Sequence, residues 1–197
     1  MSQQQQQIAQ KSQTKLQEMI DKANRCKEQD FSYQDMTRID LTRQFLEGSK
    51  FIHAKLSGAN LARTNLNNCD CSYADFSGAN LNDGWLRESN LTGANLSFAD
   101  LSENLIGKTN FTNANLSHVN FENAVFIDDC IWDGANLTGA HYGFYDTGSH
   151  EEKIFMTKPP VVLFGKTQGG HGYKVMIFDK YIKIGCQLRS YKEWLEM

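Results

Sequence analysis

The strongest constraint on this sequence is a run of large apolar residues placed five apart. From Phe31 to Phe126, all twenty residues in this register are apolar, whereas apolar residues make up 40% of the whole chain. A helix repeats every 3.6 residues and a strand every two, so neither places each fifth residue on the same side. The pattern predicts a backbone that turns inward at a fixed interval, in segments too short for an ordinary strand.

A second register accompanies the first, two places before each large residue. From Ser49 to Ala124, fourteen of these sixteen residues are Ala, Ser, Thr, Cys or Gly, and the exceptions are Asn104 and Val119. One large and one small inward residue in every five predicts a narrow tube, because its interior has no room for two large side chains per segment. Four segments would close a square coil of about twenty residues, and coils would stack about 4.8 Å apart.

This pattern resembles that of the pentapeptide-repeat family, A(N/D)LxX, as "GANL" illustrates at 58–61, 78–81, 93–96 and 134–137. The resemblance implies an all-β solenoid, a right-handed quadrilateral β-helix of about five to six coils. We expect a glutamine run and an amphipathic capping helix over 1–28, and the β-helix over 29–146. A β-rich tail that ends in a short helix is expected over 147–197.

Both ends of such a helix need a cover, because they expose unpaired backbone groups. The amphipathic pattern over 8–28 favours an N-terminal lid, and a partner-binding or dimerising helix is the alternative. We also expect a distorted first coil, because its inward positions break the small-residue rule; they are Gln29, Gln34, Ile39 and Gln44.

The five-residue register slips by one residue between Phe126 and Leu137. Either Ile131 is a large inward residue and Gly134 is the extra one, or Trp132 points inward and the insertion falls earlier. A bulge in this region would disturb one coil near the end of the repeat.

The tail segment "IKIGCQLRSYKEWL" resembles tails of some phage and bacterial repeat proteins. Gly185, Cys186, Glu193 and Trp194 match that pattern, and Arg189 stands where a histidine is expected. The resemblance is short, and it gives no reason to expect metal or catalytic chemistry in the tail.

No motif predicts an enzyme, a cofactor or a metal site. "GKT" at 165–167 lacks the glycine of a phosphate-binding loop, because Pro160 occupies that position. Cys69 and Cys71 fall on inward positions, where a cysteine acts as a small apolar residue. The five histidines are scattered without ligand spacing, and the Asn and Asp residues before the large residues are expected to form outward ladders.

Composition favours a soluble cytoplasmic protein with reduced cysteines. The net charge is -3, the five cysteines are an odd number, and no apolar run approaches the roughly 20 residues of a membrane helix. The N-terminus lacks the features of a signal peptide. We expect neither membrane binding nor direct binding of nucleic acid, because the whole chain is not strongly charged.

Stacking at twenty residues turns the outward positions into four columns. Three columns carry Asn, Asp or Lys throughout, whereas the fourth reads Phe45, Asn65, Trp85, Leu105 and Val125. An apolar stripe on one face needs a cover. The chain's own tail or N-terminal helix could provide it, and a second copy or a protein partner is the alternative. We therefore predict Phe45, Trp85, Leu105 and Val125 as partner-binding residues of a non-catalytic scaffold.

Acidic residues suggest a second function. Residues 64–146 hold eleven acids against Arg87 and Lys108. A narrow acidic rod resembles duplex DNA, and members of the resembled family bind DNA gyrase by such mimicry, so inhibition of gyrase or a host defence factor is the alternative to a scaffold. A merely solvated face is the simpler interpretation. The candidate acidic surface is Asp75, Asp83, Glu88, Asp100, Glu103, Glu122, Asp128, Asp129 and Asp133.

Overall fold

The structure is a computed structural model, and it describes three stretches of the chain in full: residues 14–25, 28–126 and 130–142. Beyond them it describes the backbone of β4 (Ile154–Phe155), β5 (Val161–Lys166), β6 (Gly172–Ile177), β7 (Tyr181–Ile184) and β8 (Gln187–Ser190).

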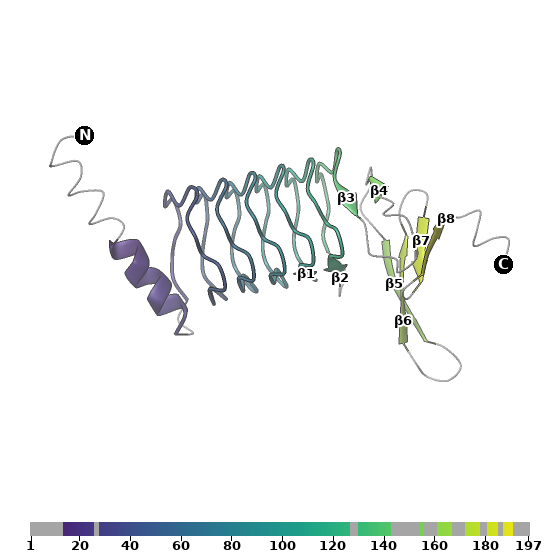
Figure 1. The fold of residues 1–197 in the computed structure, drawn as a ribbon, viewed down its shortest axis with the longest axis horizontal. Coiled ribbons are helices and arrows are strands. Elements are labelled where there is room, and N and C mark those ends of the chain that lie inside the picture. The colour runs from purple at the N-terminus through teal and green to yellow at the C-terminus, as the bar shows by residue number, and fades with distance from the viewer. Residues whose placement is uncertain are drawn as a thin grey trace.

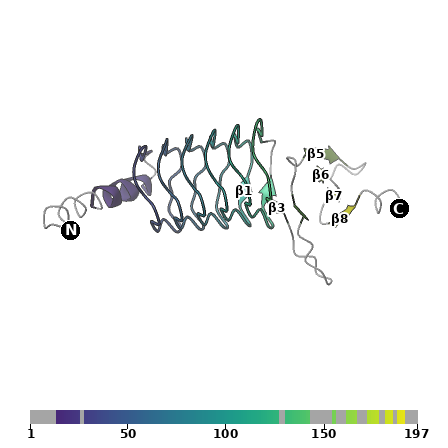
Figure 2. The same cartoon turned by 90° about the horizontal axis from the view of Figure 1, so that it is seen from above.

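The repeat region winds into stacked four-sided coils (Figures 1 and 2). Parallel backbone bridges join residues twenty apart, beginning with Asp30 and Lys50 and continuing to Asp100 and Asn120. We number the four faces by the large residues of the first coil, which are Phe31, Met36, Leu41 and Leu46 for faces 1 to 4. On face 4 the ladder includes two short strands, β1 (Leu105–Ile106) and β2 (Val125–Phe126), which pair in parallel.

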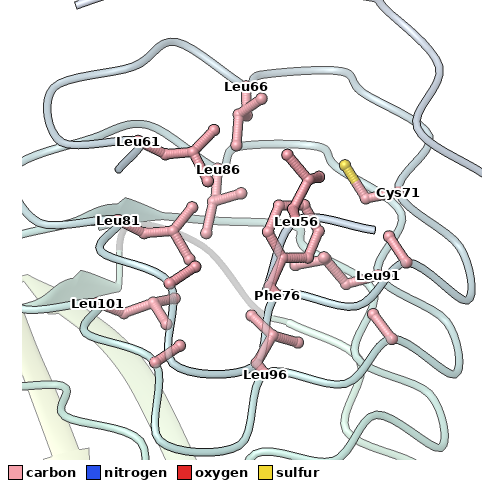
Figure 3. Packing of buried hydrophobic residues seen from close by; sticks show 14 of the residues in the cluster. Leu56, Leu61, Leu66, Cys71, Phe76, Leu81, Leu86, Leu91, Leu96 and Leu101 are labelled. Atoms are coloured by element: carbon pink, nitrogen blue, oxygen red, sulfur yellow. The ribbon is translucent and has the colours of Figure 1, made fainter. Parts of the chain in front are cut away.

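The inward residues fill the tube as the two registers predict. The large residues from Leu56 to Leu101 point into the tube in successive coils (Figure 3). All the large residues from Phe31 to Phe126 are buried. Small polar residues at the second inward position bond back to the preceding coil, since the Thr64 hydroxyl donates to the Leu41 carbonyl at 2.6 Å and Ser89 donates to Leu66 at 2.7 Å. Their buried polar atoms are thereby satisfied without widening the tube.

Asn104, a large exception to the small-residue rule, has a matching glycine one coil earlier. Its side-chain amide donates to the Leu81 carbonyl at 2.7 Å, and a Cβ atom added to Gly84 would lie 3.0 Å from that amide nitrogen. Glycine at 84 therefore leaves the space that Asn104 occupies. The bridge between Trp85 and Leu105 keeps the regular spacing, so the pair causes no distortion of the ladder.

Asn and Asp precede the large residues because their side chains make two kinds of hydrogen bond. The side-chain oxygen accepts the backbone N–H two residues later, as Asp70 does from Ser72 at 3.1 Å, which closes the turn. An asparagine also donates to the same position one coil earlier, as Asn90 does to Asp70 at 3.1 Å. The predicted ladders are thus present, and they link successive coils through side chains as well as backbone.

The register slip is resolved by the bridges. After Asn110 the pairing spans 21 residues, because Asn110 pairs with Ile131 and Asn115 pairs with Asn136. Trp132 takes the large inward position and stacks on Phe111 with ring centroids 4.7 Å apart, whereas Ile131 is exposed. The second alternative therefore holds, and the extra residue lies between Phe126 and Ile131.

A helix over residues 14–23 lies at the N-terminal end of the coils. Ile20 and Ala23 are buried against the core, and Asn24 accepts the backbone N–H of Phe45 at 2.8 Å. All four bridges of the first coil join residues twenty apart, as in the later coils, so the prediction of a distorted first coil is wrong. In the part of the chain that the structure describes, the helix takes the place of a preceding coil, and the Asn24 amide donates a hydrogen bond to the Gln44 side chain. Residues 8–13 and 26–27 of the predicted lid lie outside the described residues.

The C-terminal side changes from a parallel to an antiparallel arrangement. β3 (His141–Tyr142) ends the described coils and pairs antiparallel with β4, while β5, β6, β7 and β8 form a separate antiparallel sheet in that order. The first two residues of "GKT", Gly165 and Lys166, are the last two residues of β5. The next described element is another strand, β6. The predicted terminal helix, with Glu193 and Trp194, and the matched residues Gly185 and Cys186 lie outside the described residues.

We predict that Leu96→Asp abolishes folding of the repeat. Leu96 is fully buried, so the substitution would place a charge without a partner in a tube that has no room for water. Asn80→Ser, on the surface, removes one ladder bond and should lower the free energy of unfolding by only about 1 kcal/mol. Circular dichroism and thermal unfolding measure both, and a Leu96→Asp variant with an unchanged spectrum and melting point would contradict the inward assignment.

Acid should weaken the first coil through its aspartates. Hydrogen bonds from Ser32, Thr37 and Thr42 lower the pKa of the three preceding carboxyls, those of Asp30, Asp35 and Asp40. In the unfolded chain these carboxyls have a pKa of about 4, and in the folded protein their pKa is lower. The ionised groups therefore stabilise the fold fully above about pH 4, and this stabilisation is lost as the pH falls through the folded pKa.

The triple variant D30N/D35N/D40N tests this contribution, because asparagine still accepts the turn hydrogen bonds but does not titrate. Between about pH 6 and pH 2.5 its melting temperature should fall less than that of the wild-type protein. Equal losses in the two proteins would show that these three carboxyls contribute nothing to the acid sensitivity.

Candidate protein-interaction surface

Face 4 carries the apolar stripe outward, and we call it the apolar face. Phe45 is 60% exposed, Trp85 38% and Val125 48%, and Leu105 is half-buried. Strands β1 and β2 mark this face in Figure 1. The bridges from Phe45 to Asn65, Trp85, Leu105 and Val125 place these residues in one column, as the twenty-residue spacing predicts.

The apolar residues give up the hydrogen bonds that the same position makes on other faces. Asn65 is the one member of the column able to close its turn, and it accepts the N–H of Asn67 at 2.9 Å. Phenylalanine, tryptophan, leucine and valine have no oxygen for this purpose, and at the next coil the Arg87 N–H bonds to Asn67 instead, at 2.8 Å. The repeat itself favours Asn or Asp here, so local folding does not explain the apolar side chains.

The N-terminal helix reaches one end of the apolar face. There a hollow of about 460 Å³ is lined by Ala23, Glu28, Phe45, Glu47, Gly48, Asn65 and Asn68. Glu47 accepts the side-chain amides of Asn65 at 3.0 Å and Asn68 at 3.2 Å. Among the three fully described stretches, no segment covers Phe45, Trp85 or Val125, so the helix does not cover the stripe.

The predicted acidic surface divides into an edge and scattered residues. Asp83, Glu103 and Glu122 follow one another along the turns between faces 3 and 4, and Glu103 N–H donates to the Glu122 carbonyl at 2.8 Å. The Arg63 guanidinium pairs with Asp83 at 2.9 Å, which neutralises one end of this edge. The acidic edge therefore borders the apolar face.

The other acids lie around the tube. Asp75 is on face 2, Asp100 on face 3, and Asp133 in a turn after face 1. Glu88, in a turn after face 4, pairs with Lys108 at 3.6 Å. The structure does not bring these four together, and Asp128 and Asp129 lie outside the described residues.

Stacked rings form a surface feature that the sequence reasoning missed. His53 lies between Tyr33 and Tyr73, with ring centroids 5.2 and 5.1 Å apart, and the two tyrosines are 75% and 56% exposed. The Tyr73 ring lies over Gly93, and a Cβ atom added to Gly93 would be only 2.6 Å from the nearest ring carbon. A second stack joins Phe98 to His118 at 4.8 Å. Reading the residues two places after each large one at a spacing of twenty would have found both stacks.

The described residues contain no group of three or more potential metal ligands and no helix long and apolar enough to span a membrane. Cys69 and Cys71 are buried in the core, as predicted, and a hydrogen bond with Cys69 together with burial raises the pKa of the Cys71 thiol. A buried thiol with a raised pKa is a poor nucleophile.

The family model described as pentapeptide repeats matches eight copies over residues 46–83, 86–103 and 107–128. The repeat region belongs to the pentapeptide-repeat family. Pentapeptide-repeat proteins fold as right-handed quadrilateral β-helices, and the described coils have this four-sided form. A comparison with curated proteins gave no match.

Several solved pentapeptide-repeat structures are similar to this chain. One from the Arabidopsis thaliana thylakoid lumen is 30% identical with a TM-score of 0.44, covering 57% of this chain and 63% of its own. One from Nostoc is 37% identical with a TM-score of 0.21, covering 44% and 63%. QnrB1, a plasmid-mediated fluoroquinolone resistance protein, is 19% identical with a TM-score of 0.26, covering 57% and 72%. This chain spans less than two thirds of the length of the first two.

Proposed function

We propose that this pentapeptide-repeat protein is a non-catalytic scaffold that binds a protein through its apolar face. One observation carries the proposal: Phe45, Trp85, Leu105 and Val125 replace the Asn and Asp residues that the repeat uses for turn closure. Exposed apolar residues gathered in one column mark contact sites on soluble proteins. Tryptophan at the centre of the column is the residue type most often found to dominate binding energy.

The coil structure suits such a surface because it holds the side chains in place. Trp85 and Leu105 are anchored by backbone pairing to the coils before and after them, Val125 is paired with the coil before it, and Phe45 is held by the coil after it and by Asn24. Binding therefore requires little ordering of the backbone, which reduces the entropic cost of association.

Mimicry of DNA is a second candidate, supported by the acidic edge of Asp83, Glu103 and Glu122. It has less support from the geometry. Asp83 is paired with Arg63, and Asp75 and Asp100 accept hydrogen bonds from the asparagine ladders of two different faces. A complex held by acids would weaken steeply as salt rises, whereas an apolar contact would not.

Site-specific photo-crosslinking can locate the contact. Asn65 on the apolar face and Asn60 on face 3 are half-exposed and lie in the same coil, so they form a matched pair for a benzoylphenylalanine crosslinker. In bacterial lysate at low and high salt, we expect protein adducts from position 65 at both salt concentrations and none from position 60. Equal adducts from both positions, or none from position 65, would overturn the proposal; adducts lost at high salt would favour mimicry.

A double variant separates binding from folding. Trp85→Asn with Leu105→Asn would extend the asparagine ladder from Asn65, with each added hydrogen bond contributing about 1 kcal/mol. We expect a melting temperature equal to or above that of the wild-type protein, together with loss of the adducts from position 65. A clear fall in melting temperature would instead show that the apolar residues serve the fold of this chain.

A further inference from the structure

We infer that the protein bound at the apolar face is a second copy of the same chain, with the two coil stacks side by side and pointing in the same direction. The inference rests on the proposed function of the apolar face and names its partner. It is carried by the charges on the two edges of that face.

The two edges carry different series of charges. The turn residues just before face 4 form the first edge, which reads Arg43, Arg63, Asp83, Glu103 and Asn123 from one coil to the next. The residues just after face 4 form the second edge, which reads Glu47, Asn67, Arg87 and Gly107; the next position holds Glu88 and Lys108, which pair with each other at 3.6 Å. The first edge runs from basic to acidic, with Arg63 and Asp83 paired between neighbouring coils, and the second edge carries an acid at Glu47 and a base at Arg87.

A two-fold axis parallel to the coil stack places the first edge of one copy against the second edge of the other, coil by coil. Arg43 then faces Glu47 of the second copy, and Asp83 faces Arg87. Both pairs have opposite charge, and each occurs twice because the interface is symmetric. Within the face, each apolar residue meets its own equivalent, so Trp85 contacts Trp85 and Leu105 contacts Leu105.

The reversed arrangement is electrostatically worse. With the stacks pointing in opposite directions about the central coil, each edge meets itself, so Arg63 faces Glu103 with opposite charge, but Asp83 faces Asp83 and Arg87 faces Arg87. Asn65 is also placed against Leu105, which sets an amide against an apolar side chain. Like charges at the centre of an interface select against this orientation.

The apolar face has a hollow that can receive a side chain of the second copy, and its apolar column is short. The hollow beside Phe45, about 460 Å³, can receive the Phe45 ring of the second copy where the two first coils meet. From Phe45 to Val125 the column spans four coil spacings, about 20 Å. A contact of this length is small beside specific interfaces, which bury about 1,200 Å² in total or more, so the dimer should depend on concentration.

Sedimentation of the full chain from about 1 to 200 µM tests the dimer, and charge exchange tests its orientation. Arg43→Glu places two acids opposite each other at both symmetric positions, and Glu47→Arg does the same with two bases. Each variant alone should raise the dissociation constant at least about tenfold. Mixed together, they form a heterodimer in which both pairs are again opposite in charge, and its dissociation constant should return to within about threefold of the wild-type value.

Arg38→Glu is the matched control, because Arg38 occupies the equivalent turn position in the same coil between faces 2 and 3. It should leave the dimer unchanged. Circular dichroism checks that each variant is folded. A wild-type protein that stays monomeric, a mixture that fails to restore the dimer, or an equal effect of Arg38→Glu would overturn the inference. Adducts from position 65 to a different protein would overturn the inference and leave the proposed function standing.

Discussion

The width of the tube interior controls the whole structure, because each face can place only one large and one small side chain inside it. Leu96 and Ala94 on face 2 illustrate the rule, since both are fully buried. The chain therefore turns once in every five residues. Four such turns bring the backbone back above the previous coil after twenty residues. Hydrogen bonds between coils then follow without any long strand.

A fold held by its inward residues and backbone leaves the outward positions free to vary. The residue before each large one is an exception on three faces, where Asn or Asp closes the turn and joins the ladder. On the apolar face the chain forgoes these bonds at Phe45, Trp85, Leu105 and Val125. A stable repeat tolerates that loss because the coils above and below still hold the backbone, which is how surface chemistry can change on an unchanged frame.

Inward positions, faces and columns could be predicted from the sequence, because they follow from spacing alone. The register slip could not be placed, since Ile131 and Trp132 are both large and apolar and only the pairing with Asn110 distinguishes them. Distortion of the first coil was wrongly expected because the small-residue rule applies where coils stack on both sides. The ring stack of Tyr33, His53 and Tyr73 was missed because histidines were considered singly rather than in columns.

Orientation of a dimer is the least obvious property that such columns encode. Residues four apart in sequence, such as Arg43 and Glu47 or Asp83 and Arg87, lie on opposite edges of one face. A parallel two-fold axis brings the first member of each pair against the second member of the same pair in the other copy. Opposite charges four residues apart across an apolar face therefore favour parallel self-association, whereas opposite charges separated by whole coils along one edge favour the reversed form. In a solenoid, short-range charge patterns can thus specify how two long surfaces meet.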